Sequence, residues 1–209
     1  MMDLSERAWV KHTVFHPFEG FEDLRWKKAG SLLFANIVIV LWFIGAVLCE
    51  NFYGKQFVIV NIDEFSVVPF IIRTIVLFLA GVISNWAVCT LLDGEGNVRR
   101  IYIYSAYALI PYVAQLYIQT VLSHFLIRDE EVLLIIVEAV GTLWSGLLIF
   151  MAIKTVHQFS VSKTIWSLLL TIAGMLIILL LFVLMISLFQ QMYAFIAEIY
   201  TELEYRLRA

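Results

Sequence analysis

The chain has 209 residues, of which 62% are hydrophobic and only 15% are charged, and its formal net charge is −3. A soluble domain of this length needs more polar surface than this composition supplies. The small net charge and the position of the basic residues at the borders of apolar runs exclude a nucleic-acid partner. Several runs reach the roughly 20 residues that a helix needs to cross the hydrocarbon of a lipid bilayer. We therefore predict an all-α, polytopic membrane protein, because the ten-residue alternating segments of a β-barrel are not seen.

Residues 1–30 form a polar N-terminal segment that precedes the first apolar run. Within it, residues 16–28 predict a short interfacial helix, because Phe18, Phe21 and Leu24 can share one apolar side while the basic residues face headgroups. An ordinary cytoplasmic lead-in is the open alternative. The first apolar run begins too late for a signal peptide and no A-x-A site follows it, so we expect it to remain as an anchor.

Five apolar runs divide residues 31–189 into spans that predict a five-helix transmembrane bundle. The spans are residues 31–49, 67–92, 101–127, 132–153 and 164–189. Residues 50–66 form the first loop, and its apolar core 57–60 is too short to cross and predicts either a strand or a surface turn. In the fourth span, Gly141 and Ser145 form a small-xxx-small pair that suits close contact between helices.

A polar turn with two glycines joins the second and third spans. Its prominent residues are Asp93, Gly94, Gly96, Arg99 and Arg100. The glycines can adopt backbone angles that other residues avoid, and the adjacent arginines favour the cytoplasmic side. Further along, Pro111 is expected to kink or break the third span, which neighbouring helices in a bundle can tolerate.

Residues 190–209 predict an amphipathic helix that continues the fifth span. Its apolar residues recur at spacings of three and four: Met192, Ile196, Ile199, Leu203 and Leu207. Glutamates interleave with them, so that one side is apolar and the rest is polar. This apolar stripe is the surface expected to face a partner.

The distribution of lysine and arginine predicts the orientation. Nine lie on one side of the predicted membrane: Arg7, Lys11, Arg25, Lys27, Lys28, Arg99, Arg100, Lys154 and Lys163. Four lie on the other side: Lys55, Arg128, Arg206 and Arg208. The N-terminus is therefore expected in the cytoplasm, and five spans would place the C-terminal helix on the extracytoplasmic side.

Arg73 and Glu138 are ionisable residues inside spans, where they usually face protein or water. Each lies six residues into its span, which is roughly 9 Å at the helical rise. We predict that they form an intramembrane ion pair or share a polar network. Third-span residues of the same outer half could join them: Gln115, Gln119, Ser123 and His124. The open alternatives are a structural staple, a snorkelling arginine, or a polar pocket for a solute or a partner helix.

No motif in the chain indicates catalysis. The four histidines lack the spacing of metal ligands,, and the chain contains no nucleophile elbow, phosphate-binding loop or C-x-x-C. We therefore predict no catalytic residue, no metal and no cofactor, and a protein that is not an enzyme.

Several short segments together resemble the Yip1 domain family. They are the pre-helix segment 16–21, the turn 93–96, the sequence Tyr-Ala-Leu-Ile-Pro at 107–111 and the segment 144–163, in addition to the five spans. The resemblance implies a non-catalytic membrane protein with a cytoplasmic N-terminus. In the eukaryotic branch such proteins associate with Rab-type GTPases in vesicle traffic. The short N-terminal segment and the acidic C-terminal helix suit a prokaryotic member in the cell membrane.

Our first hypothesis is a non-catalytic integral membrane scaffold or accessory subunit. It would associate with other integral membrane proteins, such as transporter subunits, or with itself, through the C-terminal helix and the glycine turn. The alternative is a small transporter or channel component that uses a polar outer-leaflet site around Arg73 and Glu138. Inverted repeats, which many transporters have, do not fit five spans well.

Overall fold

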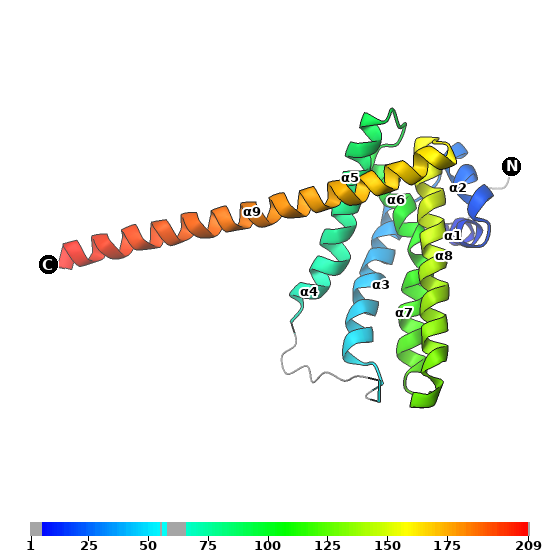
Figure 1. Cartoon of the computed structure of the whole chain (residues 1–209), viewed down its shortest axis with the longest axis horizontal. Coiled ribbons are helices and arrows are strands. Elements are labelled where there is room, and N and C mark those ends of the chain that lie inside the picture. Colours follow the sequence, from blue (N-terminus) through cyan, green and yellow to red (C-terminus); the bar gives the residue numbers. More distant parts are fainter. Residues whose placement is uncertain (1–5, 55, 58–65, 209) are drawn as a thin grey trace.

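The computed structural model describes residues 6–54, 56–57 and 66–208. The predicted strand or surface turn at 57–60 lies, apart from Phe57, outside these residues. The helices in chain order are α1 (Glu6–Phe15), α2 (Pro17–Trp26), α3 (Leu32–Asn51), α4 (Val68–Ile71), the π-helical turn η1 (Ile72–Val76), α5 (Leu77–Leu91), α6 (Val98–Ala108), α7 (Ile110–Leu122), the 3-10 turn η2 (Arg128–Glu130), α8 (Glu131–His157) and α9 (Val161–Arg208) (Figure 1).

Five helical stretches of the described chain are long and apolar enough to cross a membrane. They are α3, the run α4–η1–α5, the run α6–α7, the run η2–α8, and α9. No strand occurs among the described residues. The predicted all-α, polytopic architecture is confirmed. The chain is an integral multi-pass membrane protein.

The ends of the helices are set by local contacts that hydropathy does not report. The third span begins at Val98 instead of 101, because the Asn97 side chain caps α6 by accepting from the Arg100 amide at 2.8 Å. It ends at Leu122 instead of 127, where the chain turns at Ser123. The fourth span runs on to His157, where the next residue takes a left-handed conformation with φ 56°.

The N-terminal helices pack against the bundle. The side chains of Phe21 and Leu24 on α2 are completely buried, in a core that also contains Tyr104 and Tyr107 of α6. Phe18, which we expected on the same side, is 63% exposed. Two of the three predicted membrane-facing residues of α2 therefore face protein, because α2 lies against α8.

The third span is interrupted at Leu109, between α6 and α7, two residues before Pro111. A proline removes one backbone donor and disturbs the preceding turn. The Tyr112 amide finds a partner outside its own helix, because it donates to the Ser145 hydroxyl of α8 at 2.8 Å. Close approach of α7 and α8 is possible at Gly141, where an added Cβ would lie 2.3 Å from Oε1 of Gln115.

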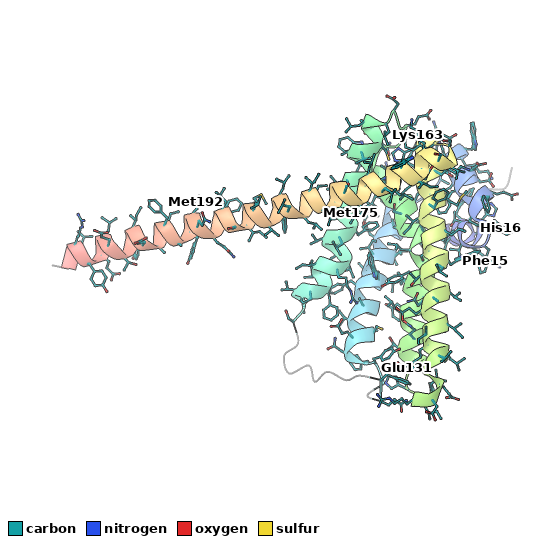
Figure 2. The ribbon with its side chains drawn as sticks, in the orientation of Figure 1. Phe15, His16, Glu131, Lys163, Met175 and Met192 are labelled. Atoms are coloured by element: carbon teal, nitrogen blue, oxygen red, sulfur yellow. The ribbon has the colours of Figure 1, made fainter. Side chains whose placement is uncertain are left out.

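The last helix, α9, packs on the bundle only through its first part. Ser84 of α5 donates to the carbonyl of Thr171 at 2.7 Å, and Gly174 leaves room for the Ser84 hydroxyl, which would lie 2.4 Å from an added Cβ. Figure 2 places Met175 beside the bundle and Met192 far from it. Beyond the contact with α5, the helix crosses the direction of the other helices steeply and projects away (Figure 1).

The contact between α1 and α2 predicts a stability difference between two glycine substitutions. In Gly20→Ala the new Cβ would lie 2.6 Å from Thr13 Cα, which is backbone, whereas in Gly146→Ala it meets nothing within 4 Å. We expect Gly20→Ala to destabilise the protein by roughly 1–3 kcal/mol through overpacking. Gly146→Ala should stabilise it by about 0.5–1 kcal/mol, because alanine replaces glycine inside a helix. Thermal unfolding in mild detergent measures both, and equal midpoints would contradict the packing described for α1 and α2.

Candidate functional site

The glycine turn, residues 93–97, closes over the imidazole of His157, which is only 1% exposed. The Gly96 amide donates to Nδ1 of His157 at 3.3 Å, so the ring hydrogen is on Nε2, which donates to Oδ1 of Asn85 at 3.1 Å,. We expected the glycines to supply unusual backbone angles, but the left-handed residue is Asp93, with φ 58°. The glycines are needed for space, since an added Cβ at Gly94 or Gly96 would lie 2.5 Å from the imidazole.

A relay of hydrogen bonds leads from His157 into the membrane-spanning part. Asn85 Nδ2 donates to the Thr171 hydroxyl at 3.0 Å, and Thr171 donates to the carbonyl of Ser167 at 2.7 Å. Every donor in this relay has an acceptor, and the four side chains of Asn85, His157, Ser167 and Thr171 are buried. The relay therefore joins the glycine turn, α5, α8 and α9 into one unit.

Arg25 attaches α2 to the same unit. Its guanidinium donates to Oε2 of Glu95 at 2.5 Å and to the carbonyl of Thr155 at 3.0 Å. We expected this basic residue to face lipid headgroups, but it binds protein instead, because α2 lies against the end of α8. Arg99, by contrast, is exposed on the first turn of α6, and Arg100 is partly exposed.

At the other end of the bundle, the predicted pairing of Arg73 with Glu138 needs correction. Nη1 of Arg73 lies 3.7 Å from Oε2 of Glu50, at the end of α3. Glu138 instead accepts from Nε2 of Gln119 on α7 at 3.4 Å. The partners differ from the prediction because η1 packs against α3, whereas this part of α8 packs against α7.

The remaining polar residues of the third span hold α7 to its neighbours. Gln119 also donates to the carbonyl of Leu134 at 3.1 Å, and Gln115 accepts from the Thr142 hydroxyl at 3.3 Å. Both glutamines are buried. Each bond connects α7 to α8, so these side chains hold the two helices in contact.

Ser123 and His124 bind backbone where α7 ends. The Ser123 hydroxyl accepts from the Gly54 amide at 2.9 Å and donates to the carbonyl of Thr120 at 2.8 Å. The exposed His124 ring lies 2.8 Å from the same carbonyl. Burial raises the pKa of Tyr53, the residue before Gly54. Ser123 thus fastens the start of the first loop to the end of α7.

The buried polar side chains of the described residues are satisfied within the protein. No buried side-chain nitrogen or oxygen there lacks a hydrogen-bond partner, and no three potential metal ligands gather among those residues. Sequence reasoning missed the relay around His157, although a usable signal was present. Asn85 and Thr171 are polar residues inside apolar runs, where they need a partner.

Comparison with known proteins adds one finding to this geometry. The family model described as the Yip1 domain matches residues 11–201. Neither the curated proteins nor the solved structures give a match. The matched segment includes the glycine turn, His157 and the first four apolar helical stretches, and it covers the fifth, α9, as far as residue 201.

The relay predicts unequal roles for two histidines. His157→Ala removes two hydrogen bonds and leaves Asn85 and the Gly96 amide without them, which we expect to lower the free energy of unfolding by about 2–4 kcal/mol. His124→Ala, at an exposed position, should change it by less than about 0.5 kcal/mol. Denaturant titration in mild detergent measures both values, and limited proteolysis should cut the glycine turn faster in His157→Ala only. Equal stability of the two variants would show that the relay does not hold the turn.

Proposed function

The chain belongs to the Yip1 domain family, and we propose that it is a non-catalytic membrane scaffold or accessory subunit whose projecting helix α9 holds other integral membrane proteins. The expected orientation, with a cytoplasmic N-terminus and an extracytoplasmic C-terminus in a prokaryotic cell membrane, forms part of this proposal. Two features support a non-catalytic role. Among the described residues no three potential metal ligands gather, and every buried side-chain nitrogen or oxygen has a hydrogen-bond partner.

The observation that carries the proposal is the length and exposure of α9. Its 48 residues extend for roughly 72 Å at 1.5 Å per residue, more than twice the span of the hydrocarbon layer. From Leu180 to Leu207 every side chain except Ser187 and Glu204 is exposed. Lipid can cover the uniformly apolar part of α9. The amphipathic end has one apolar side and one polar side, so it suits a partner that offers an apolar surface to the first side and leaves the second in water.

The apolar stripe of this end continues the side of α9 that packs on the bundle. That side begins with small and polar residues, Thr164, Ser167 and Thr171, all buried. It continues at spacings of three and four with larger apolar residues: Met175, Ile178, Phe182, Met185, Phe189, Met192, Ile196, Ile199 and Leu203. Such a seam is typical of a helix that packs along another helix. A partner helix laid along it would bury each large side chain for about 1.5–3 kcal/mol.

The transport alternative receives less support from the geometry. Gln119 and Gln115 of α7 form hydrogen bonds with residues of α8, and Glu138 of α8 accepts one of them. Such bonds connect two helices and therefore suit a structural role. A solute pathway would require polar groups that turn toward water instead. The contact surface proposed at the glycine turn consists of its exposed residues Asp93, Glu95 and Asn97, together with Arg99 at the start of α6.

Truncation tests the role of α9. Gentle detergent purification from native membranes, followed by mass spectrometry, should recover a stoichiometric membrane partner or a defined homo-oligomer with the full chain. A chain that ends at residue 189 should lose that association, because it lacks the stripe. If every association survives the truncation, α9 is not the binding arm.

A matched pair of double substitutions locates the binding side. Ile199→Gln with Leu203→Gln places polar groups in the stripe, and we expect at least a tenfold loss of the partner, since each buried apolar side chain is worth about 1.5–3 kcal/mol. Ala194→Gln with Thr201→Gln changes the opposite side of the same helix and should leave the recovered amount unchanged. Quantitative mass spectrometry of the purified complexes gives both numbers. Equal losses in the two double variants would show that the apolar stripe is not the side of α9 that binds the partner.

A further inference from the structure

A groove of about 450 Å³ separates α5 and α9 from α6 and α8. Its walls are mainly apolar, with Phe78, Val82 and Ile149 among the residues that line it. Ile172 of α9 is 57% exposed, so the groove opens at the surface of the bundle. The volume lies in the range of small-molecule sites, about 300–1,000 Å³. Its surroundings in a membrane are lipid chains.

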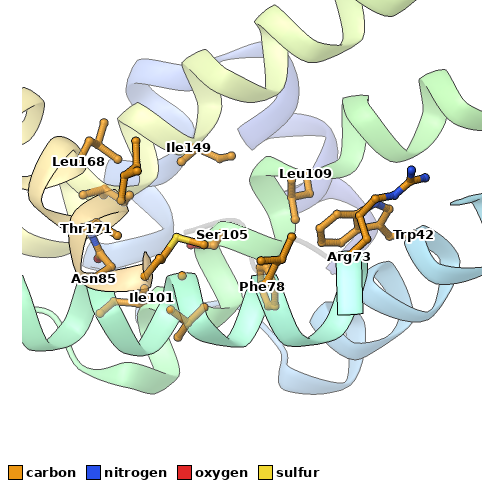
Figure 3. A pocket seen from close by; sticks show the side chains of 16 residues that line it. Trp42, Arg73, Phe78, Asn85, Ile101, Ser105, Leu109, Ile149, Leu168 and Thr171 are labelled. Carbon is orange, nitrogen blue, oxygen red and sulfur yellow. Dashed lines mark hydrogen bonds between the residues drawn. The ribbon is translucent and has the colours of Figure 1, made fainter. Parts of the chain in front are cut away.

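The two ends of the groove differ in chemistry. Figure 3 shows Trp42 and Arg73 at one end, and Asn85 with Thr171 at the other. Asn85 and Thr171 already bind one another, so the second end offers no unused charge. Arg73 and Asn85 lie twelve residues apart, roughly 18 Å at the helical rise. Half of the hydrocarbon layer is about 15 Å thick, so the groove is long enough to hold one acyl chain.

Arg73 is held where an anionic group could reach it. It belongs to the π-helical turn η1, and π-helical turns are rare and often mark functional sites,. The side chain is 54% exposed, and its neighbouring acid among the described residues, Glu50, lies 3.7 Å away. That distance is longer than a hydrogen bond, so the guanidinium keeps donors for a phosphate, which it can bind in a forked geometry.

We propose that the groove binds one acyl chain of an anionic phospholipid, with the phosphate of its headgroup at Arg73. The apolar walls accommodate the chain, the cation attracts the headgroup, and the distance between the two ends suits the length of one acyl chain. This inference is independent of the role of α9 as a binding arm. A neutral acyl chain alone would fit the walls but would make no contact with the exposed guanidinium of Arg73.

The headgroup is tested with the full-length protein in a non-ionic detergent and two fluorescent lipids of equal chain length, phosphatidylglycerol and phosphatidylcholine. The wild type should bind phosphatidylglycerol about tenfold more tightly, as expected for one charge-assisted contact. Arg73→Gln should bind both lipids equally. Glu50→Gln, which removes the competing carboxylate, should bind phosphatidylglycerol at least as tightly as the wild type.

The groove itself is tested by filling it. Gly81 lines it, and a Cβ there would lie 3.5 Å from the sulfur of Met175, an ordinary contact, so Gly81→Leu should fold and exclude the chain. We expect at least a tenfold loss for both lipids. Gly146→Leu, on α8 where a Cβ meets nothing within 4 Å, is the matched control and should bind as the wild type does. Gly81→Ala, a smaller change, should give a partial loss even if the leucine variant is unstable.

Three results would overturn the proposal as a whole, and a fourth would overturn its assignment of the headgroup. The first is equal affinity of the wild type for the two lipids, and the second is equal binding by Gly81→Leu and Gly146→Leu. The third is recovery of a second copy of the chain, in place of lipid, from a photo-crosslinker at Ile172. A loss in Gly81→Leu together with an unchanged preference in Arg73→Gln would contradict the assignment of the headgroup.

Discussion

Polar groups within a bilayer must find partners inside the protein, because no water is available there. The imidazole of His157 is the centre of one such arrangement in the described chain. It accepts from the Gly96 amide, donates to Asn85, and through Asn85 reaches α9. Arg25 then attaches the N-terminal helices to the same end of α8. The glycine turn, two spans and the start of α9 therefore depend on one buried side chain, and the glycines are there because the imidazole leaves no room for a Cβ.

Close contact between helices follows the same rule in the rest of the bundle. Without a strong hydrophobic drive between helices in lipid, small residues and side-chain hydrogen bonds hold spans together. Gly141 and Ser145 of α8 receive Gln115 and the Tyr112 amide, so the break near Pro111 lies against the helix that supplies its missing partner. The small residues of α8 thus accommodate the break in the third span, although the two features are 30 or more residues apart in the sequence.

The proposed arm and the proposed lipid groove have a common structural origin. α9 contacts α5 closely through Thr171 and Gly174 and then leaves the bundle (Figure 1). Because α9 stays with α5, a groove remains between this pair and the helices α6 and α8. The same divergence exposes the apolar stripe of α9 beyond the bundle. One end of the helix therefore lines the proposed lipid groove, while the other forms the proposed binding arm.

The sequence by itself determined the features that depend on local composition and spacing. The thickness of the hydrocarbon layer makes apolar length a direct measure of spanning helices, so all five were found, and so was the continuous C-terminal helix. Depth along a helix could also be counted, and this count led to the prediction that Arg73 and Glu138 lie at matching height. The direction of a side chain around the helix axis could not be counted, because it depends on which helices are neighbours. Only the tertiary structure decided that Arg73 faces Glu50, that Glu138 faces Gln119, and that His157 fills the turn.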